Sequence, residues 1–438
     1  MNSKMRFWES IRKKGFELLD LAKGRPIMRH YDNIAHLWRS KEEINHHHRE
    51  QFTRLAEFAV QHTEYYKGIR ISSTPQLSDF PIIDKAVLKE NFEALCSCKA
   101  KEKGAIAMHT SGSTGTPLIV MQDKNKRNRV YAEMMYLWGL SGYQIGMKYA
   151  FLRRWNRINK KSSLTAFARN LVMVDVAMLD HDTMEQIKQV LLKKNKVRMM
   201  IGYASNLGAL ADYLLESGCT PDMFGLTTIL SGSEVLTDVV RNKLKKIFGC
   251  NVISLYSNQE NGMLAVECNE NKEFHLNEAS YIFELLKLDS DEPAEEGELG
   301  RVVITDLYNY AMPIIRYDTG DLAIRKSRAE CGIHTAVIAA VEGRRVDIIY
   351  DVNGVPLSPH TVTNALWQFN KLKQFQLIQT GKKTYTFKVN DPQEHYSDDE
   401  LVETCKDFFG ESATIQIERV ADIPVLASGK FKYLICEM

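Results

Sequence analysis

The sequence predicts an α/β protein: a large N-terminal domain with parallel sheets and crossover helices, followed by a small α+β C-terminal lid domain. Three observations support this prediction. The chain has 438 residues, more than one small domain needs. Strand-like and helix-like segments alternate through its middle, as in parallel sheets with crossover helices. That alternation stops after Gly343, so we place the two domains at residues 1–343 and 344–438.

The first hundred residues are expected to be helical, because Phe7, Ile11, Phe16 and Leu19 recur near helical spacing. Basic residues lie between these apolar positions. Such a helix could touch a membrane surface or a partner, or it could pack on its own domain. We expect the second arrangement, since it is the commoner one.

The predicted sheet follows a polar, glycine-containing loop that is flanked by apolar runs at 105–109 and 118–121. A helix is expected at 124–140. Strands are then predicted at 149–152, 171–176, 199–201, 227–230, 252–255, 301–305 and 313–317. The expected crossover helices are 182–194, 206–216 and 237–248. Ligands of such sheets bind beyond the carboxyl ends of the strands, where the polar clusters 231–234 and 256–260 fall.

The C-terminal region has a different pattern of short strands and helices. A strand at 347–350 meets a turn at Asn353-Gly354, and a helix is expected at 359–369. The remaining elements are strands at 375–380 and 385–389, a helix at 398–409 and a last strand near 414–419. Together they predict a compact α+β module.

Composition excludes several classes of protein. Hydrophobic residues make up 44% of the chain and charged residues 26%, which argues against disorder. The formal charge is +2, and no nucleic-acid recognition module is found, so we expect no nucleic-acid partner. No run approaches the ~18 apolar residues of a membrane span. The eight cysteines are scattered and no secretion signal is evident, so we expect a cytoplasmic location.

The most informative segment is a loop of hydroxyl and glycine residues after His109. Glycine lets the backbone curl, so that NH groups and hydroxyls can converge on one oxyanion. The loop lacks the Gly-Lys-Ser/Thr of P-loop nucleotide triphosphatases. The candidate phosphate-binding residues are Thr110, Ser111, Gly112, Ser113, Thr114, Gly115 and Thr116.

Together with Pro117, this loop resembles the phosphate loop of the adenylate-forming enzyme superfamily. Five more elements that resemble motifs of this superfamily follow in order and extend the resemblance to residue 430. They are Ser231-Gly232-Ser233-Glu234, Tyr256-Ser257-Asn258-Gln259-Glu260, Arg316-Tyr317-Asp318-Thr319-Gly320-Asp321, Gly343-Arg344-Arg345-Val346-Asp347 and Ser428-Gly429-Lys430. The sequence is most similar to the phenylacetate–coenzyme A ligase-like branch, which includes the CapK-type proteins linked to capsular polysaccharide biosynthesis.

The resemblance implies that ATP and Mg²⁺ are used to activate a carboxylic acid as an acyl-AMP. The acyl group would then pass to a thiol or amine acceptor, such as coenzyme A, a carrier or an amino sugar. Glu260 would hold Mg²⁺, and the catalytic Lys430 would act at the α-phosphate, where negative charge accumulates. Besides the 110–116 loop, the implied ATP-binding residues are Gly232, Ser233, Glu234, Tyr256, Ser257, Gln259, Asp321 and Arg344. Tyr256 would stack on adenine, and Asp321 would hold the ribose hydroxyls.

The sequence departs from the superfamily pattern at three positions. Ser257 and Gln259 replace a glycine and a threonine, and Val346 replaces the first aspartate of the hinge element. Two alternatives therefore stay open beside polysaccharide biosynthesis. One is an aryl acid–coenzyme A ligase, and the other is a non-catalytic nucleotide-binding relative.

Members of this branch often carry a zinc site formed by Cys, His and a later Cys-x-Cys. Here Cys268, His275 and Cys331 match, but Ala329 stands where the remaining cysteine is expected. His334 could supply a fourth zinc ligand, or the residues could be unliganded.

The segment 153–169 contains six basic residues and no acidic one. It could receive an anionic substrate or acceptor, or it could be a solubilising loop.

Overall fold

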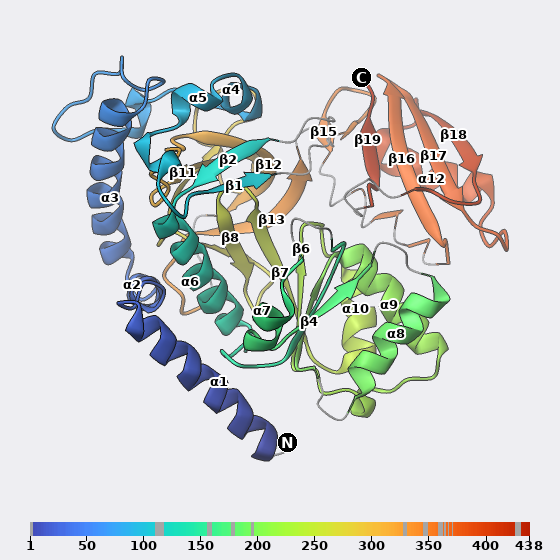
Figure 1. Ribbon diagram of the computed structural model, residues 1–438. Helices are drawn as coiled ribbons and strands as arrows, with labels where there is room; N and C mark the ends of the chain where they lie inside the picture. The colour runs from blue at the N-terminus through green and yellow to red at the C-terminus, as the bar shows by residue number, and fades with distance from the viewer. Residues whose placement is uncertain are drawn as a thin grey trace.

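The computed structural model describes residues 3–109, 118–155, 160–176, 180–193, 197–326, 331–344, 349–357, 371–424 and 431–438, with a few more between 362 and 369. Helices fill the N-terminal region, a large sheet runs through the middle, and a separate small sheet lies at the C-terminal end (Figure 1). The predicted fold class is confirmed.

The described strands of the middle region form an 11-stranded sheet. Its order is β10 (Tyr281–Leu286), β11 (Leu299–Asp306), β12 (Tyr317–Lys326), β13 (Val337–Arg344), β9 (Phe274–Leu276), β8 (Gly262–Glu267), β7 (Asn251–Asn258), β6 (Thr228–Gly232), β5 (Met199–Gly202), β3 (Tyr149–Arg153) and β4 (Leu171–Asp175). Strands β3 to β7 pair in parallel, and β7 to β13 continue the sheet with antiparallel pairs. The five strands predicted between residues 149 and 255 are therefore present.

Helices cover the parallel strands on both faces. On one face lie α8 (His181–Leu192), α9 (Ala204–Glu216) and α10 (Asp238–Phe248). On the other face lie α2 (Met28–Leu37) and α6 (Lys124–Leu140). Local sequence fixes the helix ends: the Thr237 hydroxyl accepts a hydrogen bond from the Val240 NH, and α10 stops at Gly249, whose φ is +60°.

The remaining elements of the N-terminal region are short, apart from two long helices. They are α1 (Ser3–Ala22), α3 (Lys41–His62), α4 (Lys85–Glu90), α5 (Phe92–Leu95), α7 (Ser163–Ala168) and the 3₁₀ turns Leu77–Asp79, Cys98–Lys101 and Pro221–Met223. Strands β1 (Ile106–His109) and β2 (Ile119–Gln122) pair antiparallel on either side of the predicted phosphate loop.

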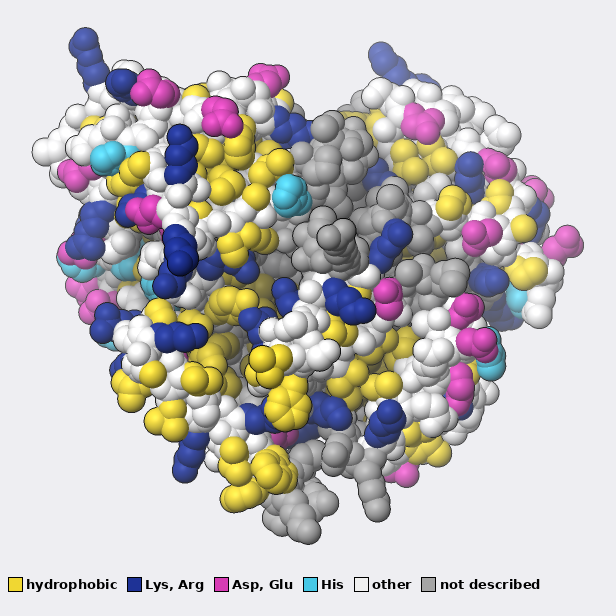
Figure 2. Space-filling view, in the orientation of Figure 1, with side chains coloured by type: hydrophobic (Ala, Val, Ile, Leu, Met, Phe, Trp, Pro, Cys, Tyr) yellow, Lys and Arg dark blue, Asp and Glu magenta, His cyan; other side chains and the backbone are white. Residues whose placement is uncertain are grey.

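Two predictions for this region are wrong. The segment 313–317 is not a strand, because β12 begins only at Tyr317 and Arg316 has a φ of 51°. Helix α1 was expected to pack on its own domain through its apolar residues, but Phe7, Ile11 and Leu19 are exposed and Phe16 is half-buried, and the helix is attached by buried Glu9 instead. Hydrophobic side chains accordingly gather at the lower left of the molecule, where α1 and α7 lie (Figure 2).

The C-terminal region contains a four-stranded sheet with its own apolar core. Its elements are β14 (Ile349–Tyr350), β15 (Pro356–Leu357), β16 (Gln374–Gly381), β17 (Thr384–Asn390), α12 (Asp398–Phe409), β18 (Thr414–Arg419) and β19 (Leu434–Cys436). The last strand, β19, was not predicted. It pairs in parallel with β16 and forms one edge strand of the sheet. Most of the helix expected at 359–369 lies outside the described residues.

In the part of the chain that the structure describes, no helix is long and apolar enough to cross a membrane.

Candidate nucleotide and acyl-transfer site

The two polar clusters predicted at strand ends leave the sheet at the same edge. Strands β6 and β7 are parallel and in register, with Ser231 opposite Ser254 and Gly232 opposite Leu255. The chain beyond Gly232 and the chain beyond Leu255 therefore emerge side by side. Ser233 has a φ of 69°, so the chain turns sharply directly after β6.

Tyr256 and Asp321 form one half of the site. The Tyr256 hydroxyl donates a hydrogen bond of 2.9 Å to Asp321 Oδ2. The Asp321 NH is held in turn by the Thr319 hydroxyl at 3.0 Å. Burial and the Asp321 charge raise the pKa of Tyr256 well above its usual value, so the phenol stays protonated as a donor. The sequence motifs predicted both residues but not the bond that joins them.

Glu260 forms the other half, in the tight turn between β7 and β8. Its side chain is buried, and Oε1 accepts a hydrogen bond of 3.2 Å from the Tyr317 hydroxyl. Lys85 Nζ lies 3.8 Å from the same oxygen. Among the described residues, Oε2 has no hydrogen-bond partner. A fixed carboxylate with one oxygen available fits the role of a Mg²⁺ ligand.

A buried ionic network lies directly behind the Glu260 turn. Lys126 Nζ is 2.8 Å from Asp306 Oδ2, 4.0 Å from Glu133 Oε1 and 3.0 Å from the Tyr281 hydroxyl. The Tyr281 hydroxyl lies 3.0 Å from the carbonyl oxygen of Asn261, the residue after Glu260. All five of these side chains are fully buried. The network therefore fixes the turn that presents Glu260.

No motif or spacing in the sequence indicates this network. Its members are up to 180 positions apart, and its lysine, aspartate, glutamate and asparagine are residue types that ordinarily lie at the surface.

Glu234 has a different environment from the one expected of an adenine-lining residue. Its carboxylate accepts hydrogen bonds from the Ser205 NH at 2.8 Å and the Ser205 hydroxyl at 3.1 Å, at the first turn of α9. Its Oε1 also lies 3.3 Å from the backbone nitrogen of Phe431. Glu234 thus connects the end of β6 with a helix N-terminus and with the C-terminal region.

Several predicted residues cannot be placed from the structure. Residues 110–116 and Lys430 lie outside the described residues. Arg344 pairs with Asp321 through the backbone of β12 and β13, but its side chain is not described. Of the three positions that depart from the superfamily pattern, Gln259 is exposed, Ser257 is half-buried and Val346 lies outside the described residues.

Cations gather around Tyr131, next to the Glu260 turn. Arg169 donates a hydrogen bond of 2.6 Å to the Tyr131 hydroxyl, and the Arg127 guanidinium lies 5.7 Å from the ring centre. Burial acts to raise the pKa of Tyr131, but the Arg169 hydrogen bond and charge lower it overall. Arg127 also donates to the Gln122 amide at 3.1 Å, and Gln122 donates to the Glu260 carbonyl at 2.9 Å. The basic segment therefore adjoins the site.

Cys268, His275 and Cys331 are brought together, as the sequence predicted. Their ligand atoms all lie within 4.8 Å of one another. His275 Nδ1 is 3.2 Å from the Thr335 hydroxyl, which leaves Nε2 facing Cys331 Sγ at 3.1 Å. Two thiols and an imidazole are donors that fit Zn²⁺. Among the residues described, His334 is not part of this group.

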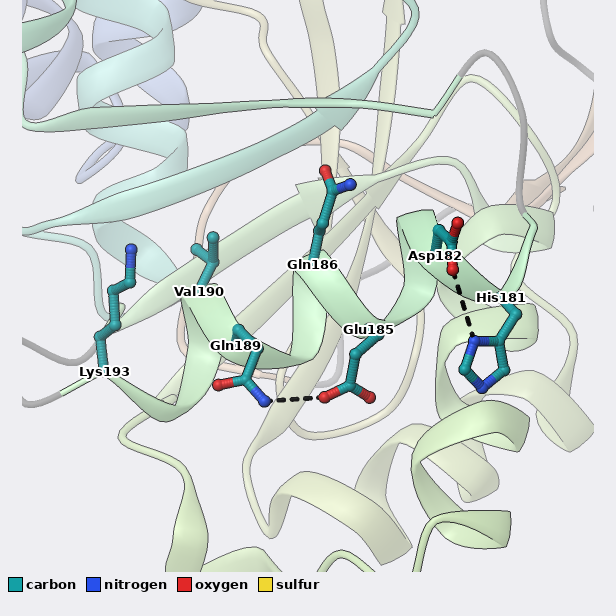
Figure 3. Close-up of a pocket in the computed structure, with 7 residues that line it drawn as sticks. All are labelled: His181, Asp182, Glu185, Gln186, Gln189, Val190 and Lys193. Carbon is teal, nitrogen blue, oxygen red and sulfur yellow. Dashed lines mark hydrogen bonds and ion pairs between the residues drawn. The ribbon is translucent and has the colours of Figure 1, made fainter.

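A surface hollow of about 560 Å³ lies along α8 (Figure 3). Its lining comes from this helix and the residue that follows it: His181, Asp182, Glu185, Gln186, Gln189, Val190 and Lys193. None of the candidate site residues lines it, and two of its polar side chains, Glu185 and Gln189, bond to each other at 2.7 Å. We assign no function to this hollow.

The fold matches that of solved acyl-coenzyme A ligases. Solved structures of 2-hydroxyisobutyryl-coenzyme A ligase superpose with TM-scores up to 0.72, at 16% identity, covering 90% of this chain and 89% of the ligase. That score is for the ligase in its postadenylation state, in complex with an acyl-AMP. It falls to 0.59 for the same ligase in its thioesterification state.

The sequence is homologous to CapK and to phenylacetate–coenzyme A ligases. It is 22% identical to protein CapK of Staphylococcus aureus, over 94% of this chain and 93% of CapK. It is 25% identical to a phenylacetate–coenzyme A ligase of Thermus thermophilus, over 74% of this chain and 76% of the ligase. Residues 349–437 match the CapK C-terminal domain.

Proposed function

We propose that this protein is an ATP-dependent ligase that converts a carboxylic acid into an acyl-AMP and transfers the acyl group to the thiol of coenzyme A. The observation that carries the proposal is the pairing of Tyr256 with Asp321 and of Tyr317 with Glu260 at one edge of the sheet. Homology to coenzyme A ligases along most of the chain supports the same chemistry.

The site residues Asp321, Tyr256 and Glu260 each have a role in this reaction. Asp321 accepts hydrogen bonds from the ribose hydroxyls, while the Tyr256 hydroxyl holds the carboxylate in place. Glu260 would hold Mg²⁺, and the ion would supply positive charge that neutralises the phosphates. The buried network behind the turn keeps Glu260 in position before ATP arrives. Preorganised groups of this kind lower the barrier because they need no rearrangement during the reaction.

Lys430 supplies the cation at the α-phosphate. The residue that follows it, Phe431, has its NH at Glu234, next to the end of β6. This contact supports an adenylation role for Lys430. The C-terminal region acts as a lid that changes its orientation between the two half-reactions. The different TM-scores against two states of one ligase are in line with such a change.

Transfer to an amine of a polysaccharide precursor is the second candidate function. It is favoured by the match to CapK along nearly the whole chain and by its C-terminal domain. The cations around Tyr131 suit either acceptor, since coenzyme A and nucleotide-linked sugars are both anionic.

Zn²⁺ is part of the proposal as a structural ion. Cys268, His275 and Cys331 would hold it and tie β8, β9 and the segment before β13 together. The chemistry of acyl transfer does not pass through this site.

ATP–pyrophosphate exchange with a panel of aryl and alkyl acids tests the proposal. We expect exchange that depends on one class of acid and on Mg²⁺, and an acyl thioester when coenzyme A is added. Glu260→Gln should abolish the exchange, whereas the matched change Glu216→Gln on an exposed helix end should leave it unchanged. ATP binding without exchange for any acid would favour the non-catalytic relative. Product formation with amino sugars alone would favour the second candidate.

A further inference from the structure

Helix α1 presents an apolar face to solvent. Phe7 and Trp8 are each 62% exposed. At 3.6 residues per turn, the exposed apolar side chains of this helix fall on one continuous face. They are Phe7, Trp8, Ile11, Leu18, Leu19 and Leu21.

The opposite face of α1 is the one attached to the protein, and it is polar. Glu9 is buried and forms an ion pair of 2.9 Å with buried Arg198. The Asp20 carboxylate accepts hydrogen bonds from the backbone nitrogens of Ile27 and Met28, at 3.1 Å and 2.9 Å. This is the reverse of an ordinary surface helix, which buries its apolar face. The outward apolar face is therefore held in a fixed orientation.

Helix α7 extends the same apolar surface. Leu164 is 79% exposed and Phe167 is 68% exposed. Arg12 of α1 joins the two helices, because its guanidinium lies 4.6 Å from the Phe167 ring centre and donates to the Phe167 carbonyl. Figure 2 shows hydrophobic side chains clustered along this lower edge with Lys and Arg side chains between them.

The charge around this surface is positive. Exposed lysines lie on or next to it: Lys14 falls on the apolar face of α1, Lys23 directly follows this helix, and Lys160 lies just before α7. Two of the three acidic residues of α1, Glu9 and Asp20, are buried. The third, Glu17, lies 4.0 Å from Lys13. The surface therefore carries a net positive charge beside its aromatic and leucine side chains.

We infer that α1 and α7 dock the protein on the surface of an anionic lipid bilayer. An amphipathic helix with Trp, Phe and Leu on one face and lysines at its border lies in the plane of a membrane interface. Helix α1 has 20 residues, so about 30 Å of helix would lie along the bilayer. The lysines would add electrostatic attraction to anionic headgroups. A second copy of the chain is a poorer fit, because it would bring two positive surfaces together.

Vesicle flotation with the full chain tests this inference. We expect the protein to float with vesicles of phosphatidylglycerol and phosphatidylcholine, and less with phosphatidylcholine alone. Trp8→Ser should lower the partition coefficient about tenfold, because one large aromatic side chain no longer enters the interface. Val355→Ser, which removes an exposed apolar side chain in the C-terminal region, should have no effect.

A charge reversal tests the electrostatic part of the inference. Lys14→Glu with Lys23→Glu should remove the preference for anionic vesicles, and added salt should do the same to the wild-type protein. The matched pair Lys382→Glu and Lys383→Glu, in an exposed turn, should bind like the wild type. Absence of flotation, or equal flotation of Trp8→Ser, overturns the inference. A dimer in light scattering that Trp8→Ser dissolves would assign the face to a second copy instead.

Discussion

Replacing Lys126 with methionine should destabilise the protein strongly without changing its surface. Lys126 is fully buried, and its ammonium contacts Asp306 at 2.8 Å and lies 4.0 Å from Glu133. Methionine keeps most of the side-chain volume but removes the charge. Two carboxylates then remain in the interior, with Arg129 as the cation left near Glu133.

The expected loss of stability in Lys126→Met equals the cost of an uncompensated buried charge, about 3–5 kcal/mol of unfolding free energy. This is a large part of the ~5–15 kcal/mol that holds a typical domain folded. For a unit of this size, the melting temperature should fall by about 6–20 °C. Lys124→Met is the matched control, because Lys124 is exposed two residues earlier on the same helix. Its effect should stay within about 0.5 kcal/mol.

The loss should also depend on pH. Burial raises the pKa of Glu133 above its usual value, and the Lys126 charge opposes that rise. Without Lys126 the pKa rises further, so the variant folds best with Glu133 protonated. Stability from such a group is present below the pKa of the unfolded state and is lost as pH rises through the folded pKa. The deficit against wild type should therefore be smaller near about pH 5 than near about pH 8.

Urea unfolding of both variants at these two pH values measures the effect. A deficit below about 1 kcal/mol, or one that does not change with pH, would refute the reasoning that Lys126 compensates buried carboxylates. Pyrophosphate exchange by the folded fraction should fall as well, because the Asn261 carbonyl loses part of its support.

Three other predictions concern the site directly. Asp321→Ala should weaken ATP binding by about 1–3 kcal/mol in calorimetry, and unchanged affinity would remove Asp321 from the nucleotide site. Lys430→Ala should lower acyl-AMP formation about 10²–10³-fold with little change in ATP affinity, whereas Lys432→Ala should retain activity. The opposite result for these two lysines would show that the motif is misaligned. Cys331→Ala should lower the zinc content measured by metal analysis and reduce the melting temperature, and a protein purified without zinc would contradict this assignment.

The strands of the large sheet could be predicted because the signals for each strand lie within a short segment of the sequence. Strands such as Met199–Gly202 are short apolar runs between helices, and each carries its own turn signals. The ordered motifs also indicated Tyr256, Glu260 and Asp321 as candidate site residues, because the resemblance to a family implies which positions lie in its site. The prediction of a strand at 313–317 failed for a local reason: the segment's apolar composition suggested a strand, but residues 313–316 belong to the connection between β11 and β12.

Features that depend on partners distant in sequence could not be predicted. The spacing of Phe7 and Ile11 shows that α1 has an apolar face, yet spacing does not show which face is buried. That choice depends on Glu9 meeting Arg198, which is 189 positions away. The environment of Lys126 depends in the same way on Asp306, since a lysine in the first turn of a helix is ordinarily exposed.

The contact between Glu234 and Phe431 links the two ends of the proposed mechanism. Glu234 follows β6 directly and caps α9, so its carboxylate is held by a rigid part of the large sheet. Its second interaction, with the Phe431 NH, involves the residue next to Lys430. This hydrogen bond is made by a backbone NH of the C-terminal region, and breaking one hydrogen bond in a rotation of that region costs little. The Ser205 bonds of Glu234 would remain, and the carboxylate would not be left unpaired. A contact of this kind can hold the chain near Lys430 against the site during adenylation and still release it for acyl transfer.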